Sequence, residues 1–255
     1  MHIDPQSDGH VHTHFCRHAV GTMEEYVQAA IDKGMRHICF LEHMEEGIQT
    51  SRTTWLSEAD FDEYFHQGKE LQKKYGTILT IDLGVEVGYN PECVEQLLKR
   101  LAGRSWDRIG ISYHFHRLQA QEDHFNVVSK SDPRVFNLDL REAASIENHY
   151  YRLLREAVKT LPGTVLCHID GVLRYYPERA RLTPPWDLID QLLDAVKEKG
   201  MAIELNTSGD AIRGEAFPGK EIRRMAQEKN IAFLAGSDAH KPEDIGQLFE
   251  RYADA

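Results

Sequence analysis

Histidine is concentrated at the start of this 255-residue chain, where four of its 14 histidines lie in DGHVHTHFCRH, residues 8–18. His10 and His12 are two residues apart, and side chains with this spacing on a β-strand point to the same face. Neutral imidazoles bind divalent transition metals, so the pair can supply two ligands to one ion. Such a pair also occurs without a metal, and its meaning therefore depends on the rest of the chain.

Further metal-ligand side chains occur where other apolar, β-prone runs end. The endings CFLEH, LGVEVGY, ISYHFH, VLCHID and FLAGSDAH supply His43, Glu86, His114 and His116, His168, and Asp238 and His240. Glu86 is a lone carboxylate in an apolar strand, and it needs a cation or strong hydrogen-bond donors there. One histidine at a strand end is more often an ordinary core residue. Because six of seven strand ends carry such groups, we interpret them together as a metal centre.

Seven apolar runs alternate with segments of helical periodicity. The runs cover residues 7–12, 37–43, 78–87, 108–115, 164–170, 201–207 and 231–238. The helical segments cover residues 22–34, 61–76, 93–103, 144–163, 185–200 and 219–230. This alternation predicts a parallel α/β sheet, and seven units favour a closed or nearly closed barrel over a doubly wound open sheet. The strand ends would then meet at one mouth, and we expect a single domain over residues 1–255.

Two polar segments, residues 45–60 and 116–139, are longer than minimal loops. Each follows the C-terminal end of an expected strand, which is where the loops of such barrels build the active site. They are either surface insertions or segments that cover and contact a substrate.

The composition excludes several classes of protein. Hydrophobic residues make up 41% of the chain, and 30 basic against 41 acidic residues give a net charge of −11, which disfavours binding of extended nucleic acid. No apolar run approaches the roughly 20 residues of a membrane span, and the start MHIDPQSDGH does not resemble a signal peptide. The four cysteines show no CxxC spacing. We therefore expect a cytoplasmic protein with reduced thiols.

The number of candidate ligands exceeds the need of one ion, since a zinc-type site takes about four. Imidazoles with few carboxylates favour Zn, Mn or Fe over Ca or Mg. We predict two to three divalent transition-metal ions, with Glu86 as a bridge. Clustered ions of this kind hold a hydroxide and an anionic substrate in hydrolytic enzymes.

The chain resembles the polymerase-and-histidinol-phosphatase (PHP) superfamily, and within it the monofunctional histidinol-phosphatase branch. The opening DGHVHTHFCRHAVGTMEEYVQAAIDKGMRHICFLEH is similar to that branch almost throughout, and LGVEVGY, ISYHF, CHID, ELNTSG and GSDAH follow in matching order. The resemblance implies a distorted (β/α)7 TIM-like barrel of the PHP type. Its active site would lie at the C-terminal ends of the strands and hold three metal ions.

The resemblance also implies three ligand sets. The first ion would be bound by His10, His12, Glu86 and Asp238, the second by Glu86, His114 and His168, and the third by His18, His43 and His240. His14 is not a ligand in that pattern, and His116 is the second choice to His114. Glu42 and Asp8 are expected to orient ligand imidazoles.

The implied reaction is hydrolysis of L-histidinol phosphate to L-histidinol and phosphate in histidine biosynthesis, by a hydroxide that bridges the metals. The alternative is a PHP phosphoesterase acting on another small phosphate ester or a nucleotide. Arg17 stands where the branch typically has proline, and DAIRGEAFPG, residues 210–219, departs from its usual pattern. These differences bear on the substrate more than on the chemistry.

The expected catalytic and phosphate-binding residues follow from side-chain chemistry and position. A guanidinium binds phosphate through two hydrogen bonds, so Arg174 and Arg213 are the main candidates for the phosphate, with Arg17 and Ser208 behind them. Asp238 and His43 are placed to protonate the leaving alcohol, by position only.

Two other classes fit less well. An amidohydrolase-type barrel also opens with HxH and ends near an aspartate, but here the middle strand offers Glu86 and no lysine. A metal-storage or sensor protein would not need ligands at successive strand ends. The expected partner is a small-molecule phosphate ester, and association into a homo-oligomer stays open.

Overall fold

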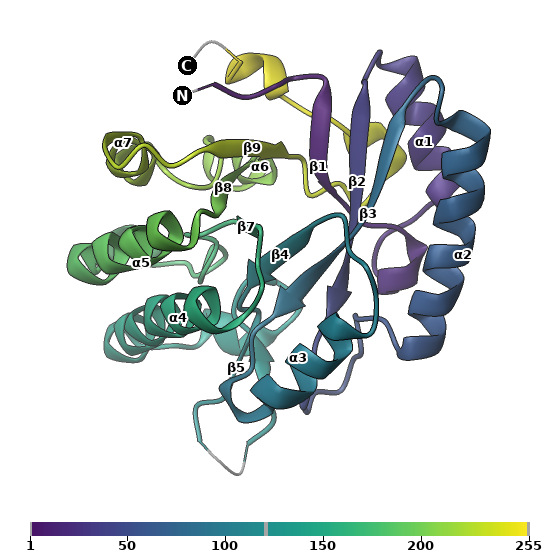
Figure 1. Cartoon of the computed structure of the whole chain (residues 1–255). Helices are drawn as coiled ribbons and strands as arrows, with labels where there is room; N and C mark the ends of the chain where they lie inside the picture. Colours follow the sequence, from purple (N-terminus) through teal and green to yellow (C-terminus); the bar gives the residue numbers. More distant parts are fainter. Residues whose placement is uncertain (1, 120–121, 254–255) are drawn as a thin grey trace.

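The core of the computed structural model, which describes residues 2–119 and 122–253, is a parallel sheet that closes on itself (Figure 1). Its strands in spatial order are β1 (Ser7–Val11), β2 (His37–Met44), β3 (Thr80–Gly88), β4 (Ile109–Ser112), β7 (Val165–Leu166), β8 (Ala202–Asn206) and β9 (Phe233–Gly236). Every neighbouring pair is parallel. The strands follow one another in space as in sequence, which is the order that successive β/α units produce.

The sheet closes between β1 and the residues that follow β9. Val11 forms a parallel bridge with Ala239. The His12 amide donates to the Ala239 carbonyl at 3.0 Å, and the Asp238 amide donates to the His10 carbonyl at 2.9 Å. The predicted nearly closed barrel is therefore confirmed, and the open doubly wound sheet is wrong.

Helices surround the strands on the outside (Figure 1). They are α1 (Met23–Asp32), α2 (Glu58–Tyr75), α3 (Val94–Ala102), α4 (Leu140–Thr160), α5 (Trp186–Lys199) and α7 (Lys220–Glu228), whereas α6 (Ser208–Arg213) lies at the mouth of the barrel. Capping boxes at Ser57 and Asp139 start α2 and α4 a few residues before the predicted periodic segments. The short helix α6 was not predicted, and it follows β8 directly.

Short elements complete the chain. The 3-10 turns are His14–Cys16, Pro91–Cys93, Pro133–Phe136, Arg179–Arg181, Pro242–Asp244 and Phe249–Arg251. The predicted run 108–115 ends early as a sheet strand, because β5 (Phe115–His116) leaves the sheet and pairs antiparallel with β6 (Phe125–Asn126). The run 164–170 is also shorter than predicted, since His168 has a φ of 24° and cannot continue β7.

The interior of the barrel below the mouth is a small apolar cluster of Cys39, Leu41, Val165 and Cys167. Two glycines let Leu41 reach the middle of the barrel. A Cβ on Gly84 would lie 2.8 Å from Leu41 Cδ1, and one on Gly110 would lie 2.9 Å from Leu41 Cδ2. The barrel is therefore filled beneath its mouth, as barrels of this size are.

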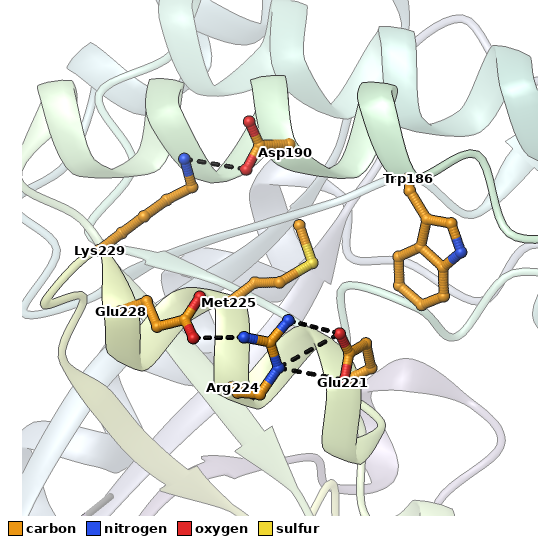
Figure 2. Close-up of a pocket in the computed structure, with 7 residues that line it drawn as sticks. All are labelled: Trp186, Asp190, Glu221, Arg224, Met225, Glu228 and Lys229. Atoms are coloured by element: carbon orange, nitrogen blue, oxygen red, sulfur yellow. Dashed lines mark hydrogen bonds and ion pairs between the residues drawn. The ribbon is translucent and has the colours of Figure 1, made fainter.

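A groove lies in the outer layer between α5 and α7 (Figure 2). It encloses about 610 Å³ and is lined by Trp186, Asp190, Glu221, Arg224, Met225, Glu228 and Lys229. Lys229 pairs with Asp190 at 2.9 Å, and Arg224 pairs with Glu221 and Glu228. Among the residues that the structure describes, no helix combines the length and apolar character needed to cross a bilayer.

Candidate metal centre

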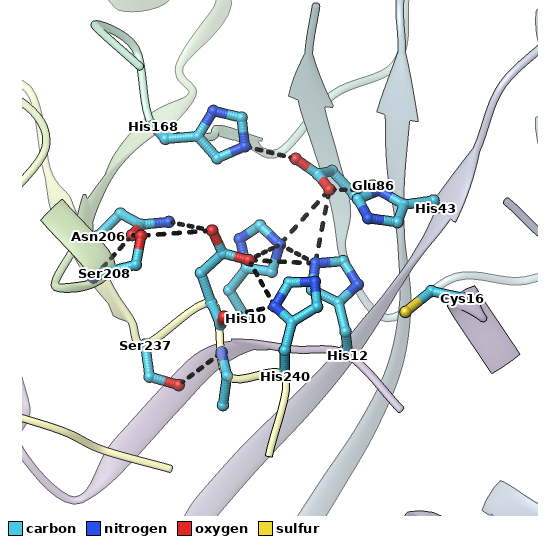
Figure 3. Close-up of polar contacts among 12 residues, drawn as sticks. His10, His12, Cys16, His43, Glu86, His168, Asn206, Ser208, Ser237 and His240 are labelled. Atoms are coloured by element: carbon cyan, nitrogen blue, oxygen red, sulfur yellow. Dashed lines mark hydrogen bonds and ion pairs between the residues drawn. The ribbon is translucent and has the colours of Figure 1, made fainter. Parts of the chain in front are cut away.

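Glu86 on β3 is the middle of a cluster of imidazole rings at the barrel mouth (Figure 3). Its Oε1 lies 2.7 Å from His168 Nε2 and 3.1 Å from His114 Nε2. Its Oε2 lies 2.8 Å from His43 Nδ1, and 3.6 and 3.7 Å from the Nε2 atoms of His10 and His12. Five rings from four different strand ends thus converge on one buried carboxylate.

Asp238 closes the cluster from the opposite side. Its Oδ1 lies 3.3 Å from His12 Nε2 and 3.9 Å from His10 Nε2. Its Oδ2 accepts weak hydrogen bonds from Asn206 and Ser208 at 3.4 Å. The backbone of Asp238 has a φ of 54°, an uncommon conformation for a non-glycine residue and one that is concentrated at functional sites.

The donor set fits metal ions. His10 Nε2 and His12 Nε2 face each other at 2.9 Å, and His18 Nε2 faces His240 Nε2 at 2.8 Å. Two such nitrogens need a shared proton or a cation between them. Within the described residues, the buried atoms His12 Nδ1 and His168 Nδ1 have no hydrogen-bond partner, and Glu86 Oε2 and His43 Nδ1 lie 2.8 Å apart without forming a hydrogen bond. Three-ligand groups form at His10, His12 and Glu86, and at His12, His43 and His240.

The charges of the cluster depend on one another. Burial opposes ionisation of Glu86, yet the charges of His114, His10 and His43 hold its pKa well below the usual range. Burial also disfavours a charged His114, but Glu86 and Glu45 raise the pKa of this ring to about 10. Burial and the charge of His12 lower the pKa of His240 to about 3. The neighbouring carboxylates thus favour the charged form of His114, and burial favours the neutral form of His240. Metal ions bind neutral imidazoles, so metal binding competes with protonation of these rings.

Carboxylates lie behind several of these rings. Glu204 on β8 contacts His10 Nδ1 at 2.5 Å, and Glu45 contacts His114 Nδ1 at 2.7 Å. Glu42 accepts from the backbone and side chain of Thr13 and lies 3.8 Å from His12 Nδ1. Glu42 was predicted for this position, but Glu204 and Glu45 were missed.

The expectation for Asp8 is wrong in its detail, because its carboxylate contacts no ligand ring. It accepts instead from three backbone amides, those of His10 at 3.2 Å, Ser237 at 3.0 Å and Gly246 at 2.9 Å. Asp8 thus ties the first strand to the segment that follows the last one.

A cavity of about 690 Å³ opens above the cluster. Its wall includes His18, His43, His114, His168, Asp238 and His240 from the centre, together with Arg174 and Ser208. Arg52 and Thr54 come from the first polar segment, and Asn126, Ser129 and Lys130 come from the second. Both long segments therefore line the cavity.

The candidate arginines lie in different places. Arg174 lines the cavity, its Nε donates to the Val128 carbonyl at 2.5 Å, and its buried Nη1 has no partner among the described residues. Arg213 pairs with Asp170 at 2.9 Å, and Arg17 pairs with Asp60 at 2.8 Å. Neither of these two is among the residues that line the cavity.

The structure places the remaining histidines away from Glu86, with the exception of His114. His114 faces Glu86, whereas His116 contacts the Tyr113 hydroxyl at 3.1 Å and packs on His149. His14 is exposed, and its Nδ1 lies 3.3 Å from the Gly21 carbonyl, outside the cluster. The ring of the fourth strand end that reaches the centre is therefore His114.

Comparisons with known proteins find similar proteins over nearly the whole chain. Residues 8–208 match the family model of the PHP domain, and residues 220–252 match the model described as PHP-associated. A Deinococcus radiodurans protein named "Probable histidinol-phosphatase" is 29% identical over 97% of this chain and 90% of its own length. The Bacillus subtilis protein named "Histidinol-phosphatase" is 28% identical over 96% of this chain and 97% of its own length.

The fold also occurs in a solved structure. The histidinol phosphate phosphatase of Lactococcus lactis, solved with zinc, L-histidinol and phosphate, superposes with a TM-score of 0.70. It is 18% identical, and the match covers 96% of this chain and 92% of that one.

Proposed function

Since this chain belongs to the PHP domain family, we propose that it is a metal-dependent phosphatase that hydrolyses L-histidinol phosphate to L-histidinol and phosphate. The observation that carries the proposal is the group of rings around Glu86, which lies under a cavity lined by Arg174. Relatives matched over nearly their whole length carry the corresponding name. The Lactococcus lactis structure contains zinc and both reaction products.

We propose that the chain holds two or three Zn, Mn or Fe ions in the three ligand sets. The sets are His10, His12, Glu86 and Asp238; Glu86, His114 and His168; and His18, His43 and His240. Bound divalent ions in such a cluster make water a nucleophile at neutral pH and neutralise charge on phosphoryl oxygens. Glu86 would contribute to two sets, because each of its oxygens faces different rings.

Arg174 is the residue that we propose to bind the phosphate. Its Nη1 is buried and without a partner among the described residues, so a phosphate oxygen would satisfy this donor. The Ser208 hydroxyl lies on the same cavity wall, but it donates its proton to Asn206 Oδ1 at 2.5 Å and would have to turn from this partner to bind the phosphate. Arg213 would act indirectly, by holding Asp170, and Arg17 by holding the segment around Asp60.

Asp238 and His43 are better metal ligands than proton donors. Burial opposes the charge on Asp238, but His12, His10 and His240 hold its pKa well below the usual range. Burial and the charge of His12 lower the pKa of His43 well below the usual range. Both shifts favour the deprotonated forms, an uncharged imidazole and a carboxylate, which are the forms that bind a metal ion.

Residues 1–255 are proposed to work as one domain in the cytoplasm. Asp238 and His240 lie in the segment that matches the PHP-associated model. Asp238 belongs to the same ligand set as His10, and His240 belongs to the same set as His18. The four cysteines are free thiols, as is usual for a reducing compartment.

The test combines elemental analysis with a panel of histidinol phosphate, nucleotides and sugar phosphates. We expect two to three ions per chain and preferred hydrolysis of histidinol phosphate. Arg174→Ala should raise KM for the ester about 10- to 100-fold at unchanged metal content, since a charge-assisted hydrogen bond is lost. Arg213→Ala is the matched control, with a smaller expected effect. Fewer than two ions together with no phosphate release would refute the proposal, and preference for another ester would refute the substrate.

A further inference from the structure

The ring nitrogens that point away from the centre have partners of two kinds. His10 Nδ1 contacts the Glu204 carboxylate at 2.5 Å, and His114 Nδ1 contacts the Glu45 carboxylate at 2.7 Å. His18 Nδ1 lies instead 2.8 Å from the Cys16 carbonyl, and His240 Nδ1 lies 2.9 Å from the Asp238 carbonyl. One ring in each of the first two sets is thus supported by a carboxylate outside the ligand sets, whereas two of the three rings in the third set are supported by neutral backbone. The third ring of that set, His43, has its Nδ1 2.8 Å from Glu86 Oε2, a carboxylate that belongs to the other two sets.

The supported rings of the first two sets are also more buried than His18 and His240 of the third set. His10 is fully buried, and His114 and Glu204 are 5% and 3% exposed. His18 is exposed, and the His240 side chain is 30% exposed. An ion at the third set would therefore face the solvent in the cavity, where water competes for its coordination positions.

The charge of the ligands adds to this difference. The first set contains Glu86 and Asp238, and the second contains Glu86, so each can neutralise part of an ion's charge. The third set consists of three imidazoles. A carboxylate behind a ligand imidazole makes the ring a stronger donor and fixes its orientation, and its loss typically costs 10- to 100-fold in metal affinity.

Glu204 has a position that serves two sets at once. One oxygen contacts His10 Nδ1, and the other accepts from the His168 amide at 2.8 Å and from Asn206 at 3.1 Å. The His168 backbone has positive φ, so this hydrogen bond stabilises an uncommon conformation. Gly236 makes room, because a Cβ there would lie 2.2 Å from Glu204 Oε1.

We infer that the three ion positions are unequal: two buried ions are held tightly with Glu204 and Glu45 as positioning residues, and the ion of His18, His43 and His240 exchanges with solution. The inference rests on the ligand sets of the proposed function. Its consequence is that activity follows the free concentration of the divalent metal, because the third position fills and empties while the other two stay occupied.

The first experiment titrates the metal-free protein with zinc against a chromophoric chelator. We expect two sites that bind at least about 10-fold more tightly than a third. After dialysis against a weak chelator, elemental analysis should find two ions, and added zinc should restore phosphatase activity. Three sites of equal affinity would overturn the inference and leave the proposed function intact. Fewer than two sites would contradict the proposed function itself.

The second experiment tests the positioning residues. Glu204→Gln should weaken one or both tight sites about 10- to 100-fold and leave the weak site unchanged. Glu147→Gln is the matched control, since Glu147 is a buried carboxylate on α4 that pairs with Arg179 at 2.6 Å and contacts no ligand ring. Glu45→Gln tests the second carboxylate independently if Glu204→Gln does not fold. Unchanged tight sites in folded variants at both positions would overturn the roles of these carboxylates.

Discussion

The cavity at the barrel mouth and the groove between α5 and α7 are similar in volume, at about 690 and 610 Å³, but their polar groups are satisfied differently. In the groove, Lys229 and Arg224 pair with neighbouring carboxylates on the exposed surface. At the mouth, buried nitrogens face one another, and Arg174 Nη1 has no partner within the described part of the chain. Volume alone therefore does not identify a site, whereas buried groups that need a further partner do.

The largest difference between the cavity and the groove is expected when one carboxylate in each is replaced by glutamine. Glu86→Gln removes the charge on which five rings converge, and we expect loss of about two ions and a fall in kcat/KM of about 10³-fold or more. Glu221→Gln in the groove breaks a surface ion pair and should change kcat/KM by less than about twofold. Elemental analysis and steady-state kinetics measure both. Full metal content and activity in Glu86→Gln would contradict the assignment.

Removal of metal should lower the stability of the protein through the ions at the barrel mouth, and the groove should not contribute to this effect. Ligands that bind only the folded state at about 1,000 times Kd stabilise it by about 4 kcal/mol, which for a chain of this size corresponds to a Tm shift of about 8–16 °C. We expect this fall in Tm on treatment with a strong chelator. The chelator should lower the Tm of Glu86→Gln much less than that of the unaltered protein, and it should lower the Tm of Glu221→Gln by the full amount. Equal shifts in the two variants would place the stabilising ions elsewhere.

A smaller effect on metal binding is expected at Gly236, which packs against the Glu204 carboxylate behind the metal centre. In Gly236→Ala the new Cβ would lie 2.2 Å from Glu204 Oε1, so the carboxylate that supports His10 must move. We expect tight metal binding to weaken about 10-fold and stability to fall by about 1–3 kcal/mol. Gly103→Ala is the control, because its Cβ would meet no atom closer than 3.3 Å. Zinc titration and urea unfolding compare the two, and equal zinc affinities would refute the role of this glycine.

The smallest effect is expected in the groove itself. Trp186 is 40% exposed, and Trp186→Ala should change the free energy of unfolding by less than about 1 kcal/mol and leave kcat and KM unchanged. A large loss of activity in this variant would show that the groove takes part in the reaction, and the contrast with the mouth would no longer hold.

The ligands at strand ends could be predicted because parallel strands bring their C-terminal ends together, whatever the details of the helices. The same reasoning could have identified Glu204, because it is a carboxylate in the apolar run 201–207, just as Glu86 is a carboxylate in the run 78–87. Glu45 was not, because its contact with His114 depends on how the chain leaves β2.

Loop geometry also determines that Arg174, and not Arg213, lines the cavity. Arg213 lies at the end of α6, a helix that the sequence pattern did not indicate, and this helix takes its guanidinium to Asp170. Arg174 follows the short strand β7, and its side chain reaches Val128 in the second polar segment. Nothing in residue spacing alone distinguishes these two outcomes, because both depend on the path of irregular backbone.

The seam between β1 and the residues after β9 has a consequence for how the protein is made. The Asp8 carboxylate and the Ser237 amide that it binds are 229 residues apart along the chain. At about 5–20 residues per second, a ribosome needs roughly ten to fifty seconds to synthesise that interval. During this time β1 has no strand to pair with on this side, and Asp238 does not yet exist to join His10 and His12. The complete first ligand set therefore forms only after residue 238 has been synthesised, and metal uptake there would report that the barrel has closed.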